Sequence, residues 1–189
     1  MPNVKSLLGI LVVLCCSGFA LGQMTTPPAK TPGDALNAVL NIVEHEFVTA
    51  AEAMPEDKYS FAPSAGEFKG VRTFAQQVKH VAAVNYVFGS GVLQEKPPVD
   101  AGGENGPDSV KSKAEILKFL NDSFAYLHKA LGSVTDKNQV DQIASPFGDS
   151  KVARLSLADF ATVHPMDHYG QIVEYLRMNG MVPPASRGR

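Results

Sequence analysis

Five histidines are the side chains of this sequence best suited to chemistry at neutral pH, and two of them are spaced to bind one ion. His164 and His168 lie four residues apart in the segment HPMDH. On a helix this spacing places both imidazoles on the same face, about one turn apart, which is the geometry of a two-histidine metal clamp. A third ligand then has to come from another helix that faces this one.

His80 is the best candidate for that third ligand. It lies in the middle of the segment QQVKHVAAV, and its neighbours in helical register form a mostly apolar stripe that we expect to face inward: Gln76, Gln77, Ala83 and Val84. Three neutral imidazoles without a thiolate suit zinc, nickel or iron(II) and leave at least one position for water or substrate. The pattern therefore predicts a divalent transition-metal site made of His80, His164 and His168. The alternative is a chance histidine pair and an inward histidine that is hydrogen-bonded in the core.

The other two histidines are weaker candidates, because neither has a partner at ligand spacing. His45 lies in VEHEF, between Glu44 and Glu46, and would be a rim residue or a fourth polar group. His128 lies between Leu127 and Lys129, and we expect it on a solvated face.

The first 22 residues have the layout of a secretory signal peptide. Lys5 provides a positive start, an apolar run follows from Leu7 to Cys16, and Ala20 and Gly22 place small residues before a cleavage site at Gln23. The apolar run is shorter than the roughly 20 residues of a membrane span. We therefore predict export to the periplasm or the medium, with no stable membrane span after cleavage. The alternative is an uncleaved N-terminal anchor.

Both cysteines of the chain, Cys15 and Cys16, lie inside this segment, so cleavage leaves no thiol in the mature protein. That excludes disulfides, cysteine nucleophiles and thiolate metal ligands. The whole chain carries 17 basic and 19 acidic residues, a formal charge of −2, and loss of Lys5 leaves 16 basic residues. This balance argues against a nucleic-acid partner, which would require a basic patch.

Four segments with helical periodicity must position the histidines, and they predict an all-α four-helix bundle with long connections. They cover residues 32–53, 73 to about 88, 112–132 and 156 to about 180. Capping-box patterns at Thr73 and Ser112 mark two of the starts, and Gly89 and Gly91 are expected to end the second helix. No sheet is assigned to the loop 135–154. We divide the chain into a linker at 23–31, a bundle domain at 32–184 and a tail at 185–189.

Pro165 interrupts the backbone hydrogen bonding of the last segment, directly after His164. It predicts a helix kinked near His164, or else a new helix that begins at Pro165 with His164 as its cap.

Two stretches of the sequence resemble the DinB-like family of metal-binding four-helix bundles. They are HPMDHYGQIVEYLRMNGMVPP, with its two histidines followed by Gly-Gln, and TFAQQVKHVAAVNYVF, with its single histidine. The resemblance covers roughly residues 34–184 and implies a metal triad at His80, His164 and His168 and an up-up-down-down order of helices. Characterised members of the family are thiol-dependent transferases and isomerases that use bacillithiol or mycothiol. Export would be a departure from those cytoplasmic enzymes.

Two classes of function follow. The first is a metal-dependent enzyme that activates a thiol or water for attack on a small molecule, as a transferase or a hydrolase. The second is a non-catalytic bundle that binds a metal or a ligand, and a homodimer module is a weaker third hypothesis. In the enzyme, Asp167 or Glu46 would orient a ligand or move protons, Asp159 would accept a hydrogen bond from a ligand imidazole, and Tyr169 and Gln171 would touch substrate or pack in the core.

Overall fold

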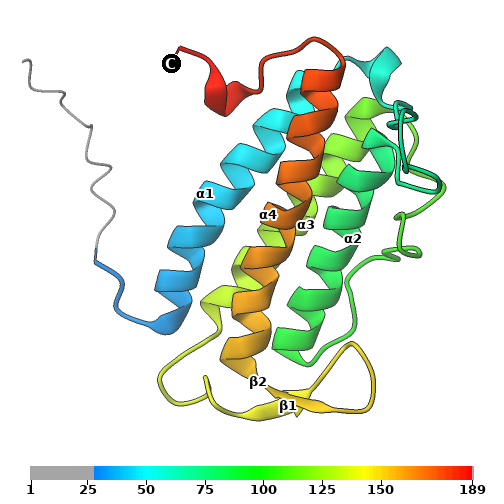
Figure 1. Ribbon diagram of the computed structural model, residues 1–189. Helices are drawn as coiled ribbons and strands as arrows, with labels where there is room; N and C mark the ends of the chain where they lie inside the picture. The colour runs from blue at the N-terminus through cyan, green and yellow to red at the C-terminus, as the bar shows by residue number, and fades with distance from the viewer. Residues whose placement is uncertain (1–27, 189) are drawn as a thin grey trace, which may run out of the picture.

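The protein is a bundle of four helices, as the sequence predicts (Figure 1). The structure is a computed structural model that describes residues 28–188, so the predicted signal peptide lies outside the described residues. The helices are α1 (Pro32–Ala53), α2 (Phe74–Leu93), α3 (Lys113–Gly132) and α4 (Arg154–Met178). Two short 3-10 helices, η1 (Glu56–Lys58) and η2 (Pro184–Ser186), follow α1 and α4. Among residues 28–188, no helix is long and apolar enough to cross a membrane.

Side chains at the helix starts define where three of the helices begin. Thr73 and Ser112 each accept a hydrogen bond from the backbone three residues ahead, and Gln76 and Glu115 return one, which confirms both predicted capping boxes. Thr31 forms the same motif at the start of α1. The bundle closes around large apolar side chains contributed by all four helices: Phe47, Phe74, Phe124 and Leu176.

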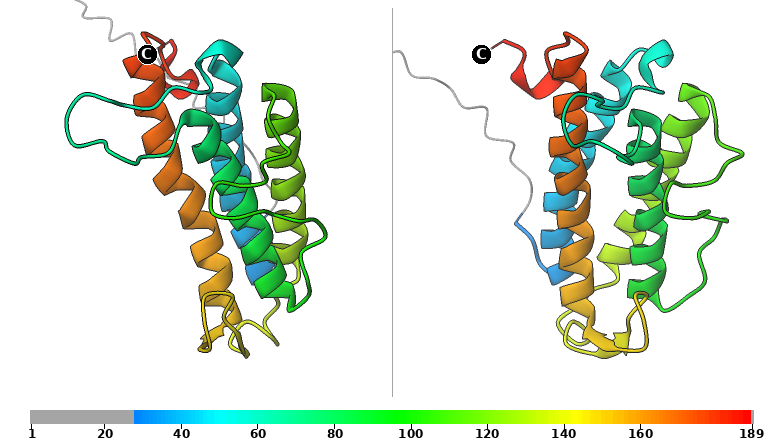
Figure 2. Two further views of the ribbon diagram at one scale, coloured as in Figure 1. Left: turned by 90° about the vertical axis from the view of Figure 1, so that its right-hand side faces the viewer. Right: turned by 45° about the vertical axis from the view of Figure 1, so that its right-hand side comes forward.

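The helices run up, down, down and up in chain order, which corrects the up-up-down-down order that the family resemblance implies (Figures 1 and 2). The start of α1 meets the end of α3, where Gly33 N donates to Val134 O (3.0 Å), so these two helices are antiparallel. In contrast, Asn85 of α2 bonds to Ser123 of α3 (3.2 Å) and Ser90 to Tyr126 (3.1 Å), so α2 and α3 are parallel.

Because α2 and α3 are consecutive and parallel, the segment that joins them must run back along the full length of the bundle. The segment 94–112 does so along the outside of α2 (Figure 2). Its 19 residues reach about 60 Å when extended, against about 30 Å for a 20-residue helix, so the return is geometrically easy. Lys79 of α2 ties the returning chain down, since its ammonium donates to the carbonyl oxygens of Pro107 (3.0 Å) and Val110 (3.3 Å).

The second helix runs past the two glycines that the sequence pattern marks as its end. It continues to Leu93, and Gln94 caps it in a left-handed conformation with φ 56°. Gly89 and Gly91 lie inside the helix because neighbours approach too closely for a side chain. A Cβ on Gly89 would lie 2.7 Å from the Tyr126 ring, and one on Gly91 would lie 2.9 Å from the Leu157 side chain.

This close approach makes Gly89→Ala an expected destabilising change. The added methyl group forces the Tyr126 ring or the α2–α3 spacing to shift, so we expect a loss of about 1–3 kcal/mol in the free energy of unfolding, measured by urea titration. Gly170→Ala is the matched control, because nothing lies within 4 Å of its Cβ. There we expect no loss, and a gain of up to about 1 kcal/mol from helix propensity. Equal effects at both positions would contradict the packing argument.

The last helix is continuous from Arg154 to Met178, with Pro165 inside it. The alternative of a separate helix that begins at Pro165 is therefore wrong, and the start lies two residues earlier than predicted.

Just before α4, a small antiparallel hairpin, β1 (Gln142–Ala144) and β2 (Lys151–Ala153), occupies the loop to which no sheet was assigned. Gln94 bonds to the edge of this hairpin, donating to Ala144 O (3.2 Å) and accepting from Ala144 N (3.1 Å).

Candidate metal centre

The three predicted histidines meet between α2 and α4. These helices are antiparallel neighbours, since Gln77 near the start of α2 bonds to Gln171 near the end of α4 (2.7 Å), and Arg154 at the start of α4 donates to Val92 O near the end of α2. The middle of α2, with His80, therefore faces the middle of α4, with His164 and His168. His80 and His168 are buried, and His164 is partly buried.

The imidazoles converge on one small volume. One ring nitrogen from each of His80, His164 and His168 lies within 4.8 Å of the others. The Nε2 atoms of His80 and His164 are 3.2 Å apart. The ring centroids are 5.1 Å apart for His80 and His164 and 4.6 Å apart for each of the other two pairs. The structure thus brings together the trio selected by spacing, while its metal content stays a prediction.

Two of the imidazoles are held by hydrogen bonds from the nitrogen that faces away from the cluster. His80 Nδ1 donates to the main-chain carbonyl of Glu104 (2.5 Å), and His168 Nδ1 donates to Gln77 Oε1 (2.7 Å). A proton on Nδ1 leaves the Nε2 lone pair free, so both rings present their ligand atoms toward the cluster. His164 Nδ1 is buried with no hydrogen-bond partner among the described residues.

A hydrogen-bonded chain of side chains fixes Gln77 in turn. Gln77 Nε2 donates to Gln171 Oε1 (2.7 Å), and Gln171 Nε2 donates to Asp167 Oδ2 (3.2 Å). The sequence suggests Asp167 as a residue that orients a ligand or moves protons and Gln171 as a substrate contact; the structure shows both in this hydrogen-bonded chain to Gln77, and their roles toward a substrate stay predictions. Sequence reasoning assigns no role to Gln77 or to the Glu104 carbonyl. Gln77 carries a signal, three residues before His80 on the same helix face, whereas a main-chain carbonyl carries none.

Gln77→Ala is expected to weaken metal binding without removing a ligand. The substitution deprives His168 Nδ1 of its acceptor, and loss of such a partner typically costs about 10- to 100-fold in metal affinity. Gln77→Glu keeps an acceptor oxygen and should retain most of the affinity, while Gln142→Ala on the exposed hairpin should leave it unchanged. Zinc titration calorimetry measures all three. A Gln77→Ala protein with the parent affinity would show that this hydrogen bond does not orient a ligand.

Burial keeps the imidazoles neutral. Burial first, and then the neighbouring His168 and His80, lower the pKa of His164 to about 3. Burial and the proximity of His80 lower the pKa of His168 to about 4, and burial is the largest influence that lowers the pKa of His80. Neutral imidazole is the form that binds a metal, so the cluster needs no deprotonation at neutral pH.

The donor set fits a divalent transition metal. Three neutral imidazoles gather with no carboxylate in the cluster, and both cysteines of the chain precede the described residues. Zinc, nickel and iron(II) all accept such nitrogen ligands, whereas calcium and magnesium prefer oxygen.

The other predicted residues lie away from the cluster. His45 is exposed on α1. His128 does not lie on a solvated face, contrary to the sequence expectation: it is partly buried, with Nδ1 against Asn37 Oδ1 (2.7 Å) and Nε2 against Glu44 Oε2 (2.9 Å). Asn37 and Glu44, both on α1, hold the His128 side chain in this position.

None of the remaining candidates is shown beside the imidazoles. Asp159 is exposed, and its backbone carbonyl accepts a bond from Thr162 Oγ1 (2.7 Å), so no bond from its carboxylate to an imidazole is seen. Glu46 is partly buried on α1. Tyr169 packs against the hydrophobic core, which agrees with the packing alternative for that residue.

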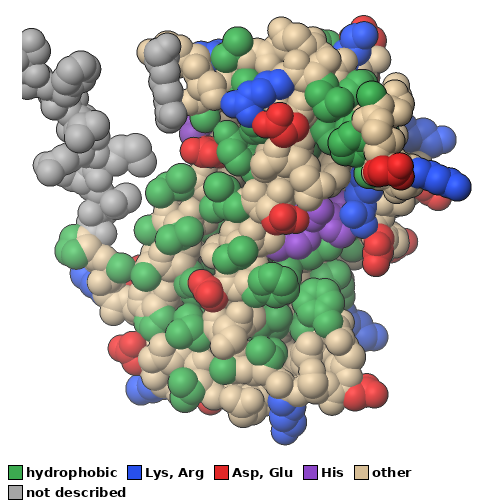
Figure 3. All heavy atoms as spheres, in the orientation of Figure 1, with side chains coloured by type: hydrophobic (Ala, Val, Ile, Leu, Met, Phe, Trp, Pro, Cys, Tyr) green, Lys and Arg blue, Asp and Glu red, His purple; other side chains and the backbone are tan. Residues whose placement is uncertain are grey.

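One hollow is lined by histidines of the cluster, and a second is lined by Gln77, which bonds to His168. A cavity of about 460 Å³ is lined by His80 and His164 together with mainly apolar residues, and a second hollow of about 510 Å³ is lined by polar groups that include Arg72, Gln77 and Gln171. Histidine side chains are visible at the surface in Figure 3, beside hydrophobic side chains and charged groups. A small molecule can therefore reach the cluster from solvent.

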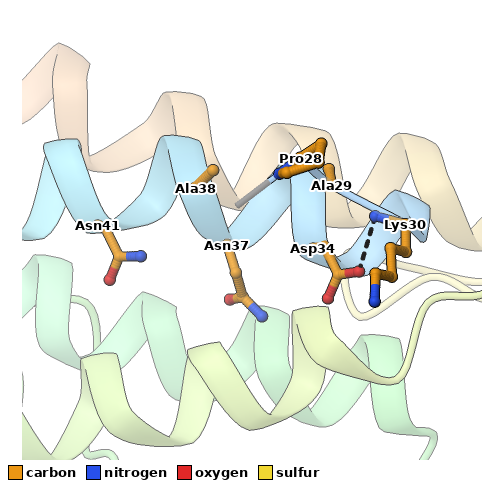
Figure 4. Close-up of a pocket in the computed structure, with 7 residues that line it drawn as sticks. All are labelled: Pro28, Ala29, Lys30, Asp34, Asn37, Ala38 and Asn41. Atoms are coloured by element: carbon orange, nitrogen blue, oxygen red, sulfur yellow. Dashed lines mark hydrogen bonds between the residues drawn. The ribbon is translucent and has the colours of Figure 1, made fainter. Parts of the chain in front are cut away.

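A third hollow, also about 510 Å³, lies at the start of α1 and is unsuited to the same chemistry (Figure 4). Its lining includes no histidine, and its only carboxylate, Asp34, already accepts from the backbone of Lys30 (3.0 Å) and Thr31 (3.0 Å) as part of the helix cap. This hollow is therefore not a candidate metal centre.

Three imidazoles from two antiparallel helices, largely buried and next to a solvent-accessible cavity, make this protein a four-helix bundle with a histidine cluster that could hold a metal ion. A comparison with protein families identifies the family of the chain. The sequence model of the DinB superfamily matches residues 40–172, which include all three histidines, and the chain belongs to this superfamily. No curated protein matches the chain.

Proposed function

We propose that the chain is an exported, metal-dependent enzyme of the DinB superfamily in which His80, His164 and His168 hold one divalent transition-metal ion. The observation that carries the proposal is the convergence of three neutral ring nitrogens within 4.8 Å, two of them oriented by outward hydrogen bonds. The layout of residues 1–22 supports export.

The reaction class follows from the chemistry of the donor set. A divalent ion held by three imidazoles lowers the pKa of a thiol or water and supplies a nucleophile at neutral pH. The chain itself contributes orientation: the Glu104 carbonyl and Gln77 Oε1 keep the protons of His80 and His168 on Nδ1, facing away from the substrate. The cavity beside His80 and His164 receives the small molecule under attack. These roles fit a transferase that uses an external thiol, or a hydrolase.

A specific observation favours the second candidate, a bundle that binds a metal or a ligand without catalysis. The only carboxylate that lines the cavity belongs to Glu104, and it is paired with Arg72 at 3.0 Å. Apart from the histidines of the cluster, the lining of the cavity therefore holds no unpaired general acid or base of the kind that many hydrolases use.

Metal analysis followed by activity assays tests the proposal. We expect elemental analysis of the purified protein to find about one zinc, nickel or iron per chain. The loaded protein should then accelerate either thiol transfer to an activated aryl chloride or hydrolysis of an aryl ester, and chelation followed by metal readdition should remove and restore that activity. A protein without bound metal would defeat the enzyme and the metal-binding form of the second candidate, and a loaded but inactive protein would favour the binding role.

A further inference from the structure

The cavity beside the histidines is walled by aromatic rings. It lies between α2, α4, the segment 101–104 and the turn of the β1–β2 hairpin, and its volume of about 460 Å³ falls within the roughly 300–1,000 Å³ typical of small-molecule sites. Three phenylalanines reach it from three separate elements: Phe88 from α2, Phe147 from the hairpin turn and Phe160 from α4. Because elements far apart in the chain supply the rings, the tertiary fold alone creates this wall.

Phe88 links the aromatic wall to the histidine cluster. Its ring is 1% exposed, and its centroid lies 5.3 Å from that of Phe147 and 5.4 Å from that of Phe160, both in edge-on arrangements. The same ring lies 5.8 Å from the His164 imidazole. A flat group in the cavity would therefore lie between phenyl rings while its neighbouring atoms lie against His80 and His164.

The other two rings are exposed to a degree that core packing does not explain. Phe147 is 56% exposed and Phe160 is 54% exposed, although phenylalanine is usually buried. Exposed apolar side chains that gather around one hollow are a mark of ligand binding, whereas scattered ones are ordinary. Both rings contact the same buried Phe88, so they belong to one surface.

Apart from an ion held by the histidines, the cavity offers no counterion for a charged ligand. No lysine or arginine lines it, and the Glu104 carboxylate is bound to Arg72 at 3.0 Å. The cationic group near the cluster, Arg72, lines the other hollow together with Gln76 and Asn105. Burial of a charge without a partner is costly, so the part of the cavity away from the histidines selects an uncharged, apolar group.

We propose that this cavity is the specificity pocket of the site and binds an aromatic, uncharged portion of the substrate, presenting the adjoining reactive group to His80 and His164. This inference rests on the proposed function and names the substrate class of that same site. The aromatic ring of the substrate contacts the exposed Phe147 and Phe160 at the opening of the cavity and the buried Phe88 inside it. Neither exposed phenylalanine is needed for metal binding.

Two chelators that differ only in their apolar part provide the test. Benzohydroxamate carries a phenyl ring and acetohydroxamate a methyl group on the same metal-binding headgroup. On the zinc-loaded protein, titration calorimetry should give benzohydroxamate at least about tenfold higher affinity. Phe160→Ala and Phe147→Ala should each reduce that preference by about three- to tenfold. The matched control is Phe68→Ala, which removes a 41% exposed ring that does not line the cavity and should leave the preference unchanged.

The outcomes separate the two proposals. If zinc binds and the two hydroxamates bind equally well, or if neither phenylalanine variant alters their ratio, the aromatic pocket is refuted while the metal site stands. If zinc, nickel and iron(II) all fail to bind, the proposed function fails, and the pocket is tested on the metal-free protein with benzyl alcohol by saturation-transfer NMR. A transfer signal that is lost in Phe160→Ala but retained in Phe68→Ala supports the pocket, and the absence of a signal overturns it.

Discussion

Alanine at His80, His164 or His168 is expected to lower zinc affinity by about a hundred- to a thousandfold, because each change removes one of only three protein ligands. The expected loss exceeds that for Gln77→Ala, since a missing ligand atom cannot be replaced by reorientation. Equilibrium dialysis with elemental analysis measures the affinity, and circular dichroism verifies that each variant retains its helices.

His45→Ala is the matched control for these variants. It makes the same substitution at an exposed histidine of α1 that lies outside the cluster, so zinc binding should stay at the parent level. A triad variant that still binds one ion tightly would show that the ion lies elsewhere. Loss of zinc binding in His45→Ala would also place the ion outside the cluster.

The second large effect is acid destabilisation of the metal-free protein. His164 and His168 have folded-state pKa values of about 3 and about 4, and that of His80 is also lowered, whereas an unfolded histidine titrates near pH 6.5. Below pH 6.5 these histidines become protonated in the unfolded chain but stay neutral in the folded chain. The free energy of unfolding therefore falls as the pH is lowered. The stabilising contribution is complete above pH 6.5 and decreases as the pH falls toward 4.

We expect a loss on the order of 2–3 kcal/mol between pH 6.5 and 4.5, after a discount for solvent screening of the less buried ring. Urea titrations of the chelated protein at several pH values measure it. The double variant H164A/H168A removes two of the three titrating groups, so its stability should depend less steeply on pH over this interval. An identical pH dependence in parent and variant would show that the acid sensitivity has another source.

Zinc supplies an internal check on the same experiment. An ion that binds only the folded protein stabilises it by about 4 kcal/mol when present at a thousand times its dissociation constant. For a chain of this size that corresponds to a rise of roughly 10 °C in Tm at pH 7. The variants that lack a histidine ligand should show a much smaller rise.

Local patterns in the sequence predict the helices of this protein and the three histidines that form its cluster. The caps at Thr73 and Ser112 and the four-residue spacing of His164 and His168 are relations between neighbours in the chain, and such relations hold in any fold that keeps the helix. The inward placement of His80 follows from the same periodicity. This is why the trio is identifiable before any helix is placed in space, and why the DinB superfamily match spans it.

Features that depend on the contact of distant segments are not predictable in the same way. The glycines of α2 resemble a helix end in the sequence because Tyr126 and Leu157, which require their small size, come from α3 and α4. The sequence likewise indicates a surface position for His128, because its partners, Asn37 and Glu44, lie on α1. In both cases the local pattern is ambiguous, and packing between helices resolves it.

The direction of the helices has the largest consequence for the site. Since α2 and α3 are parallel, the connection 94–112 must return past α2, and this path places the Glu104 carbonyl on His80 Nδ1. The aromatic wall likewise exists only because the hairpin turn and α4 bring Phe147 and Phe160 to Phe88. The sequence by itself thus determines which residues can bind a metal, through short-range helical geometry. The tertiary structure decides how those residues are oriented and what lies beside them, because both depend on contacts between segments that are far apart in the chain.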